Sequence, residues 1–184
     1  VHSVCDDPPA QAYLRVEPEP RVKRSVEGDL GVYVNARELL AAAGEALDLA
    51  PLAALPEDAS ARRTSVELAR LACRIGLERH VGRLLPAFGA VTPRLVLRGK
   101  DLSATRLVVG TGGALVRLGD GAALLAEVLA ELRPERGRLL PPPEVDIRID
   151  RDYLMATVGV LTAEFPAAAL ALMATSLGLE AVGG

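Results

Sequence analysis

The residues with the clearest chemical potential form a glycine-rich run after the apolar residues 107–109: Gly110, Thr111, Gly112, Gly113 and Ala114. Glycine has no Cβ, so a backbone there can adopt positive φ angles and approach a ligand closely. Exposed N–H groups in such a segment can face an anion, and Thr111 adds a hydroxyl. The run matches neither G-x-G-x-x-G nor the Lys-Ser/Thr ending of a P-loop. On composition alone, a ligand loop and a tight strand-to-helix turn both stay open.

A second segment with polar chemistry, residues 24–31, places Glu27, Gly28 and Asp29 after a predicted strand. These carboxylates could hold a metal-bound water or lie beside a phosphate. The alternative is a solvated turn before a helix cap. Lys100, within residues 98–101, has the same two interpretations: a side chain near a nucleotide, or part of an ordinary loop.

Three further titratable residues have simpler interpretations. Asp150 and Asp152 could form an acid pair, but the sequence favours an N-cap with a first-turn acid, which suits the positive end of a helix dipole. His80, with Arg79 and Arg83 close to it in sequence, is predicted to lie at the surface or between lobes.

Metal and thiol chemistry has little support. The cysteines, Cys5 and Cys73, and the histidines, His2 and His80, are too few and too scattered for a structural zinc site. We therefore predict no metal site and expect both cysteines to be buried free thiols.

The composition excludes several classes of protein. The chain has 184 residues, half of them apolar, which indicates one globular domain or two small lobes. Its net charge of −3 argues against binding to nucleic acid. The most apolar stretch, residues 153–179, is interrupted by Glu164 and Pro166, so it predicts two packed core helices and no membrane span. No signal-peptide pattern occurs at the start, which favours the cytoplasm. The chain begins without Met and reads as a cut through a longer protein.

Periodicity predicts the elements that must position these residues. Strands are expected at 1–4, 12–16, 22–26, 106–109 and 145–149, the last from its strict alternation. Helices are expected behind Asn35, whose spacing to Glu38 resembles a capping box, and over 62–85, 122–132, 153–163 and 166–177. The second half alternates β and α, which favours an α/β layered sheet.

Five segments occur together in a familiar order: residues 26–31, 99–102, 109–114, 139–141 and 149–153. This set resembles the glutamate mutase accessory protein family, called GlmL or MutL and unrelated to the mismatch-repair protein. The resemblance covers nearly the whole chain. Each motif is only moderately specific, but five in order with compatible spacing are much stronger.

The resemblance implies a fold. Members of this family are similar to the actin-like ATPases, an α/β fold of the ribonuclease H-like type. That fold has two lobes, each a mixed sheet flanked by helices, with ATP between them. Residues 1–184 would be the second, C-terminal lobe, without the first lobe and the phosphate loops, and residues 35–92 a helical subdomain inserted in it. Residues 1–4 would be the second strand of that lobe, beside a central strand that this chain lacks, which leaves an unpaired edge.

The resemblance also implies a site. The run from Gly110 to Ala114 would meet the adenosine side of the nucleotide, so that a side chain at Gly112 or Gly113 would block the ligand. Glu27, Gly28, Asp29 and Lys100 are the candidate cleft loop. ATP and Mg²⁺ would serve the full-length protein, and neither is expected to bind this chain tightly. No catalytic residue stands out, and we expect no ATP turnover by this chain alone.

The implied role is the ATP-driven reactivation of an adenosylcobalamin-dependent mutase, glutamate mutase or a related one, by exchange of damaged cobalamin. Two alternatives stay open. One is an actin-like phosphotransferase for a small molecule, which would want an acid or base in the cleft. The other is a binding module that has lost its nucleotide function. Whether the protein is an enzyme therefore stays open.

Overall fold

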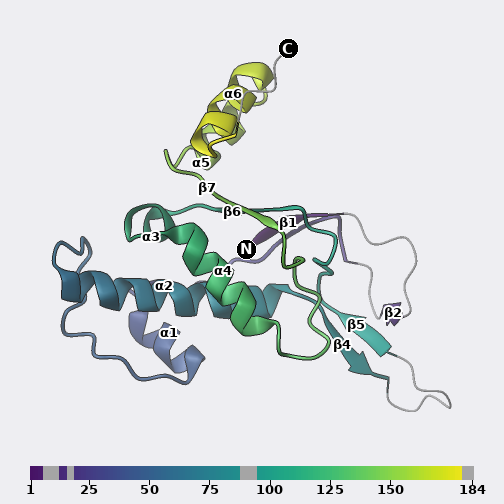
Figure 1. Ribbon diagram of the computed structural model, residues 1–184, viewed down its shortest axis with the longest axis horizontal. Coiled ribbons are helices and arrows are strands. Elements are labelled where there is room, and N and C mark those ends of the chain that lie inside the picture. Colours follow the sequence, from purple (N-terminus) through teal and green to yellow (C-terminus); the bar gives the residue numbers. More distant parts are fainter. Residues whose placement is uncertain (6–12, 16–18, 88–94, 180–184) are drawn as a thin grey trace.

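The computed structural model describes residues 1–5, 13–15, 19–87 and 95–179 (Figure 1). Strands and helices alternate along the chain, as the sequence predicts for a mixed α/β protein. The strands are β1 His2–Val4, β2 Tyr13–Arg15, β3 Val22–Arg24, β4 Arg83–Pro86, β5 Leu95–Arg98, β6 Leu107–Gly110 and β7 Asp146–Ile149. The helices are α1 Ala36–Ala43, α2 Ala59–His80, α3 Gly113–Arg117, α4 Gly121–Leu132, α5 Met155–Leu161 and α6 Pro166–Ser176.

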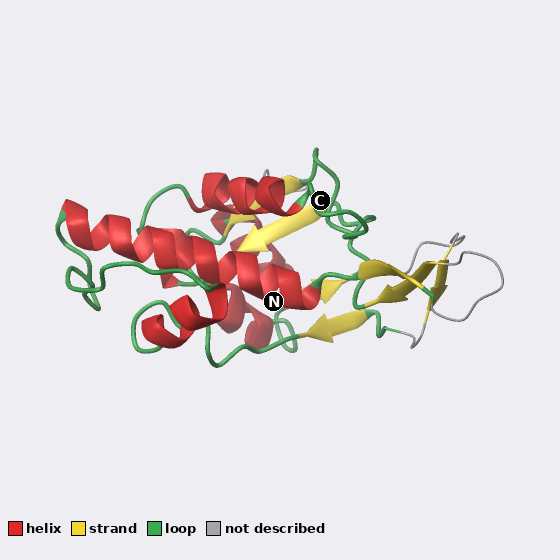
Figure 2. Ribbon diagram, turned by 90° about the horizontal axis from the view of Figure 1, so that it is seen from below, coloured by secondary structure: helices red, strands yellow, loops and turns green. Residues whose placement is uncertain are grey.

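The described strands form three small sheets rather than one continuous sheet. β1 pairs with β3 in antiparallel fashion, with Val4 opposite Val22. β5 lies between β2, which is parallel to it, and β4, which is antiparallel. β6 and β7 are parallel, with Gly110 opposite Ile149, and the chain between them passes through α3 and α4. Figure 2 shows the β4–β5 pair extending away from the helical part of the molecule.

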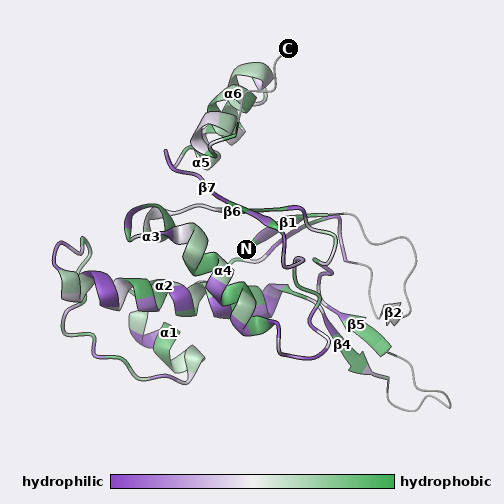
Figure 3. Ribbon diagram, in the orientation of Figure 1, coloured by the Kyte–Doolittle hydropathy of each residue, from purple (hydrophilic) through white to green (hydrophobic). Residues whose placement is uncertain are grey.

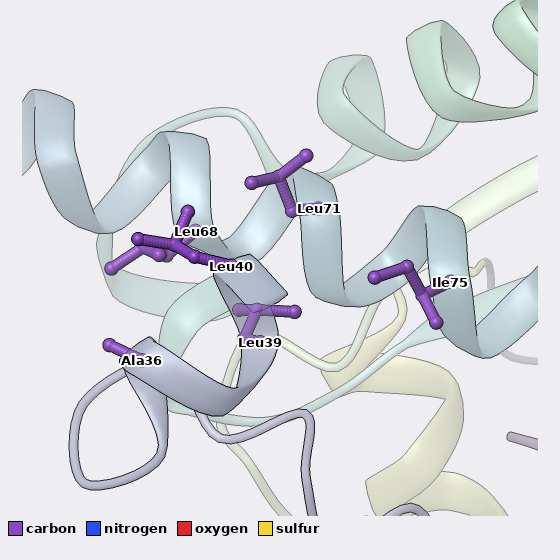
Figure 4. Close-up of a cluster of buried hydrophobic side chains, with 6 residues drawn as sticks. All are labelled: Ala36, Leu39, Leu40, Leu68, Leu71 and Ile75. Carbon is purple, nitrogen blue, oxygen red and sulfur yellow. The ribbon is translucent and has the colours of Figure 1, made fainter. Parts of the chain in front are cut away.

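Helix α2 is the central element of the core. The Asp58 carboxylate accepts hydrogen bonds from the N–H groups of Ser60 and Ala61, which caps the helix start as an N-cap aspartate should. One side of α2 packs against α1 through buried apolar side chains (Figure 4): Ala36, Leu39, Leu40, Leu68, Leu71 and Ile75. A second cluster joins α4 to the segments that follow α2 and β5: Val81, Leu102, Val128, Leu129, Leu132 and Leu140.

Some predicted boundaries are wrong for reasons that lie outside the local sequence. The helix expected over 62–85 ends at His80, and Arg83–Pro86 is the strand β4. Gly82 explains this change, because a Cβ there would lie 2.8 Å from the carbonyl oxygen of Lys100. Only glycine allows the two backbones to approach so closely. Residues 95–98, which carried no strand prediction, pair with β4 as β5.

The start of α1 is capped differently from the prediction. Asn35 makes no side-chain cap bond to the helix; its Nδ2 donates to the carbonyl of Gly28 instead. The expected helical subdomain also contains β4 as well as α1 and α2, and its residues 88–92 lie outside the described part of the chain. That division of the chain stays a prediction.

Helices α5 and α6 are present as predicted, with Pro166 in the first turn of α6, but they are not core helices. They pack against each other and project from the rest of the molecule (Figure 1). Both helices contain apolar residues, coloured green in Figure 3. Several of their apolar side chains are exposed, including Val160 at 78% and Leu170 at 69%. In the part of the chain that the structure describes, no helix is both long and apolar enough to cross a bilayer.

Candidate functional site

The structure explains two of the three glycines of the run at the end of β6. A Cβ at Gly110 would lie 2.7 Å from Cδ1 of Ile149 and 2.8 Å from Cδ1 of Leu125, so packing favours glycine there. Gly112 has a φ of +104°, which side-chain-bearing residues rarely adopt. A Cβ at Gly113 would meet nothing within 4 Å, and its φ carries no such restriction. Neither packing nor conformation explains glycine at 113.

An open groove lies along α2, which α3 contacts, and none of residues 110–114 lines it. Its volume is about 720 Å³, within the range of small-molecule sites. It lies against the first turns of α2 and is closed on one side by Leu118, which directly follows the short helix α3. The lining combines apolar side chains with hydroxyls and two guanidinium groups: Leu47, Asp48, Pro51, Ser60, Arg62, Arg63, Thr64, Val66, Glu67 and Leu118. Such a surface suits a ligand that joins an apolar ring to an anionic group.

Asp150 ties the glycine run to the C-terminal helices. It follows β7 directly, is fully buried, and its N–H donates to the carbonyl of Gly110 at 2.9 Å. Its Oδ2 accepts a bond from Oγ1 of Thr111 at 3.0 Å, and its Oδ1 accepts one from Oγ of Ser176 at 2.6 Å. The N–H groups of Leu154 and Met155 complete the set at 2.9 and 2.8 Å. Burial raises the pKa of this carboxyl, but the hydrogen bonds outweigh it and hold the pKa below its usual value.

The candidate cleft loop lies at the other end of α2. Nη1 of Arg79 contacts Oε2 of Glu27 at 2.6 Å and Oδ1 of Asp29 at 2.9 Å, and Nη2 contacts Oδ2 of Asp29 at 2.8 Å. The hydrogen bond from Arg79 lowers the pKa of Asp29. Among the described residues, no three His, Cys, Asp or Glu side chains gather as a metal site would require. The loop is tied to α2 by these ion pairs.

Lys100 is a fully buried residue in this structure. Its Nζ donates to the carbonyls of Cys5 at 3.0 Å and Pro20 at 2.8 Å, which links the end of β1 to the segment before β3. Its backbone N–H donates to the carbonyl of His80, the last residue of α2. Sixteen helical residues, about 24 Å, separate Arg63 in the groove from Arg79 beside the loop. The structure thus places Glu27, Asp29 and Lys100 at the far end of α2 from the groove, and the glycine run outside the groove's lining.

Two polar residues differ from their sequence interpretation. His80 was expected at the surface or between lobes, which is wrong: it is fully buried, with Nδ1 2.7 Å from Oγ of Ser25 and Nε2 2.8 Å from Oγ of Ser3. Asp150 is not the predicted N-cap, because Leu154 holds that position in α5 and no acidic residue lies in the first turn. Asp150 instead accepts the N–H groups of Leu154 and Met155 at the helix start. Its bonds to Thr111 and Ser176 were missed. A signal for the first exists in the sequence, since parallel strands that end at Gly110 and Ile149 bring the next residues of both strands together.

A glycine run at the carboxyl end of the parallel strand β6, between strands and helices, defines a mixed α/β protein with a candidate small-ligand site. The family model of the MutL protein matches residues 1–177, so the chain belongs to the MutL family. It is 29% identical over 196 residues to Protein MutL of Clostridium tetanomorphum. That alignment covers 94% of this chain and 41% of the relative, so the chain spans less than half of the relative's length. No solved structure matches the chain.

Proposed function

We propose that this chain is the nucleotide-binding second lobe of an accessory protein that reactivates an adenosylcobalamin-dependent mutase, glutamate mutase in the first instance. Membership of the MutL family supports the role. The observation that carries the nucleotide site is Gly113, which neither packing nor conformation explains and which stands in a glycine run at the end of the parallel strand β6. A ligand that approaches the backbone supplies the missing reason.

The arrangement of the strands supports an actin-like lobe. The antiparallel pair β1–β3 and the parallel pair β6–β7 combine both strand directions, as the mixed sheet of such a lobe does. In that lobe β1 would lie beside a further, central strand. The share of the relative that lies beyond this alignment leaves room for the other lobe.

The residues of the groove fit the nucleoside part of ATP. The apolar side chains, Leu47 and Val66 among them, can cover the base, while Arg62 and Arg63 offer charge to a phosphate. Mg²⁺ would enter with the phosphates, since the described residues hold no carboxylate cluster for an ion. When bound, ATP supplies the free energy that cofactor exchange requires.

The test compares Gly113→Ala with Gly159→Ala in the full-length protein. Both glycines are helical, neither has a positive φ, and a Cβ at either would meet nothing within 4 Å. Alanine should therefore leave the fold intact at both positions, with a small gain in stability. Only Gly113→Ala should weaken the binding of a fluorescent ATP analogue, by tenfold or more. Gly112 is a poorer choice, because its positive φ would strain any substitution.

The same variants test the biological role. Inactivated glutamate mutase is mixed with free adenosylcobalamin and the full-length protein, with and without MgATP, and the return of mutase activity is followed. We expect recovery that requires ATP, is lost in Gly113→Ala and is retained in Gly159→Ala. ATP binding that is equal in both variants would refute the nucleotide site. Binding without any mutase recovery would refute the reactivating role and leave the site standing.

A further inference from the structure

The hydrogen bonds around Asp150 show that Thr111 is the donor in the bond between these two residues. An ionised carboxylate has only acceptors, and all four described side-chain contacts of Asp150 are with donors: Thr111 Oγ1, Leu154 N, Met155 N and Ser176 Oγ. The hydroxyl of Ser176 is arranged in the same way: it donates its proton to Asp150, and its oxygen accepts the N–H of Asp152 at 3.0 Å. The hydroxyl proton of Thr111 is therefore directed inward.

This direction decides what the Thr111 hydroxyl can offer on its solvent side. The residue is exposed and stands next to Gly112 and Gly113, where a Cβ would meet open space. With its proton held by Asp150, its oxygen offers only lone pairs to whatever occupies that space. The buried negative charge behind it increases the electron density on that oxygen.

We propose that Thr111 is a hydrogen-bond acceptor in the ligand site and that Asp150 is the positioning residue that fixes this polarity. The group of the ligand that meets Thr111 is then a hydroxyl or amino donor and not a phosphate oxygen. This inference rests on the proposed nucleotide site, where the donor is a hydroxyl of the ribose. Thr111 thus selects for the sugar and orients the nucleotide with its phosphates away from this side chain.

The experiment measures the affinity of the full-length protein for ATP, 2′-deoxy-ATP and 3′-deoxy-ATP. The wild-type protein should bind ATP at least tenfold more tightly than one of the two deoxy analogues. Thr111→Val, which keeps the shape and leaves the other three donors to Asp150, should bind ATP and that analogue equally. Asp150→Asn should also lose the discrimination, because its amide can donate to Thr111 and turn the hydroxyl outward. Thr175→Val is the matched control, since its hydroxyl bonds the carbonyl of Ala171 within α6.

The outcomes separate this inference from the proposed function. ATP binding with no preference over either analogue would overturn the inference and leave the nucleotide site intact. A preference that survives in Thr111→Val would also overturn it, because another group would then read the ribose. No binding of any of the three nucleotides would refute both. Asp150→Asn removes a buried acceptor and can unfold the chain, so the result with Thr111→Val decides.

Discussion

Polar side chains are buried at one end of helix α2 and exposed at the other. At its carboxyl end, His80 lies between the hydroxyls of Ser3 and Ser25, and the neighbouring Lys100 donates to two backbone carbonyls. Along its first turns, Arg62 and Arg63 are exposed and line the open groove. Both ends are rich in groups that sequence analysis associates with function.

The difference teaches which of these groups serve the fold. A buried polar side chain must find partners within the protein, and those partners hold the surrounding segments together. An exposed polar side chain beside a groove contributes little to folding and keeps its donors for a ligand. Substitutions along α2 should therefore separate into those that change stability and those that change binding.

The largest effect is expected from His80→Leu. The substitution removes a buried ring and leaves the half-buried hydroxyls of Ser3 and Ser25 without that partner. We expect the free energy of unfolding to fall by about 2–4 kcal/mol, measured by urea denaturation at neutral pH. Nucleotide affinity of the folded protein should not change. A loss below about 0.5 kcal/mol would show that this end of α2 does not depend on its polar contacts.

The pH dependence of the free energy of unfolding should also reflect the buried His80. Burial lowers the pKa of His80 to about 4 from 6.5, with the charge of Lys23 acting in the same direction and Glu19 opposing it. Between these values the unfolded chain binds the proton and the folded chain does not, so stability falls as pH falls from 6.5 to 4. The contribution at stake is about 3 kcal/mol. Wild-type protein should lose it over this range of pH.

The matched control is the His80→Leu variant in the same series of urea titrations. Carboxyl groups such as Asp58 also lose stabilising contacts in acid, but they do so in both proteins. The difference in unfolding free energy between wild type and variant should therefore shrink as pH falls through this range. A constant difference would mean that the imidazole is accessible to protons in the folded state.

Arg79→Ala gives a smaller effect, although Arg79 contacts two carboxylates. Its side chain is 37% exposed, and ion pairs at such positions contribute about 0–1 kcal/mol. We expect a loss of that size by urea denaturation, and a smaller one at high salt because exposed charges are screened. A larger loss that salt does not change would place this pair with His80 among the groups that the fold requires.

Local sequence patterns predicted the secondary structure around the candidate site better than the long-range contacts that support it. The apolar strand before Gly110 and Pro166 at the start of α6 are local signals, and the structure bears out both. The predicted nucleotide at Gly110–Ala114 stays a prediction. What local signals missed are contacts between residues far apart in the chain. His80 meets Ser3, 77 positions earlier, and Lys100 meets Cys5, 95 positions earlier.

The predicted end of α2 and the predicted burial of α5 and α6 were wrong for the same reason. The helical period continues past His80 into residues 81–85, and nothing near them in sequence reveals that Gly82 lies against the backbone of Gly99 and Lys100. The apolar composition of α5 and α6 predicts burial, yet Val160 and Leu170 are exposed, because periodicity reports which residues are apolar and not what covers them.

The smallest change in stability is expected from Arg63→Ala. This variant also tests most directly whether the two ends of α2 differ in function. Arg63 is exposed at the first turns of α2, so the free energy of unfolding should change by no more than about 0.5 kcal/mol. If the groove binds the nucleotide as proposed, affinity for an ATP analogue should fall about tenfold, because the groove loses a charge available to the phosphates. Arg37→Ala, at an exposed position on α1, is the control and should change neither quantity. Equal ATP affinity in the two variants would show that the exposed arginines at this end of α2 are solvated surface, so that exposure beside a groove would no longer distinguish a ligand residue from any other.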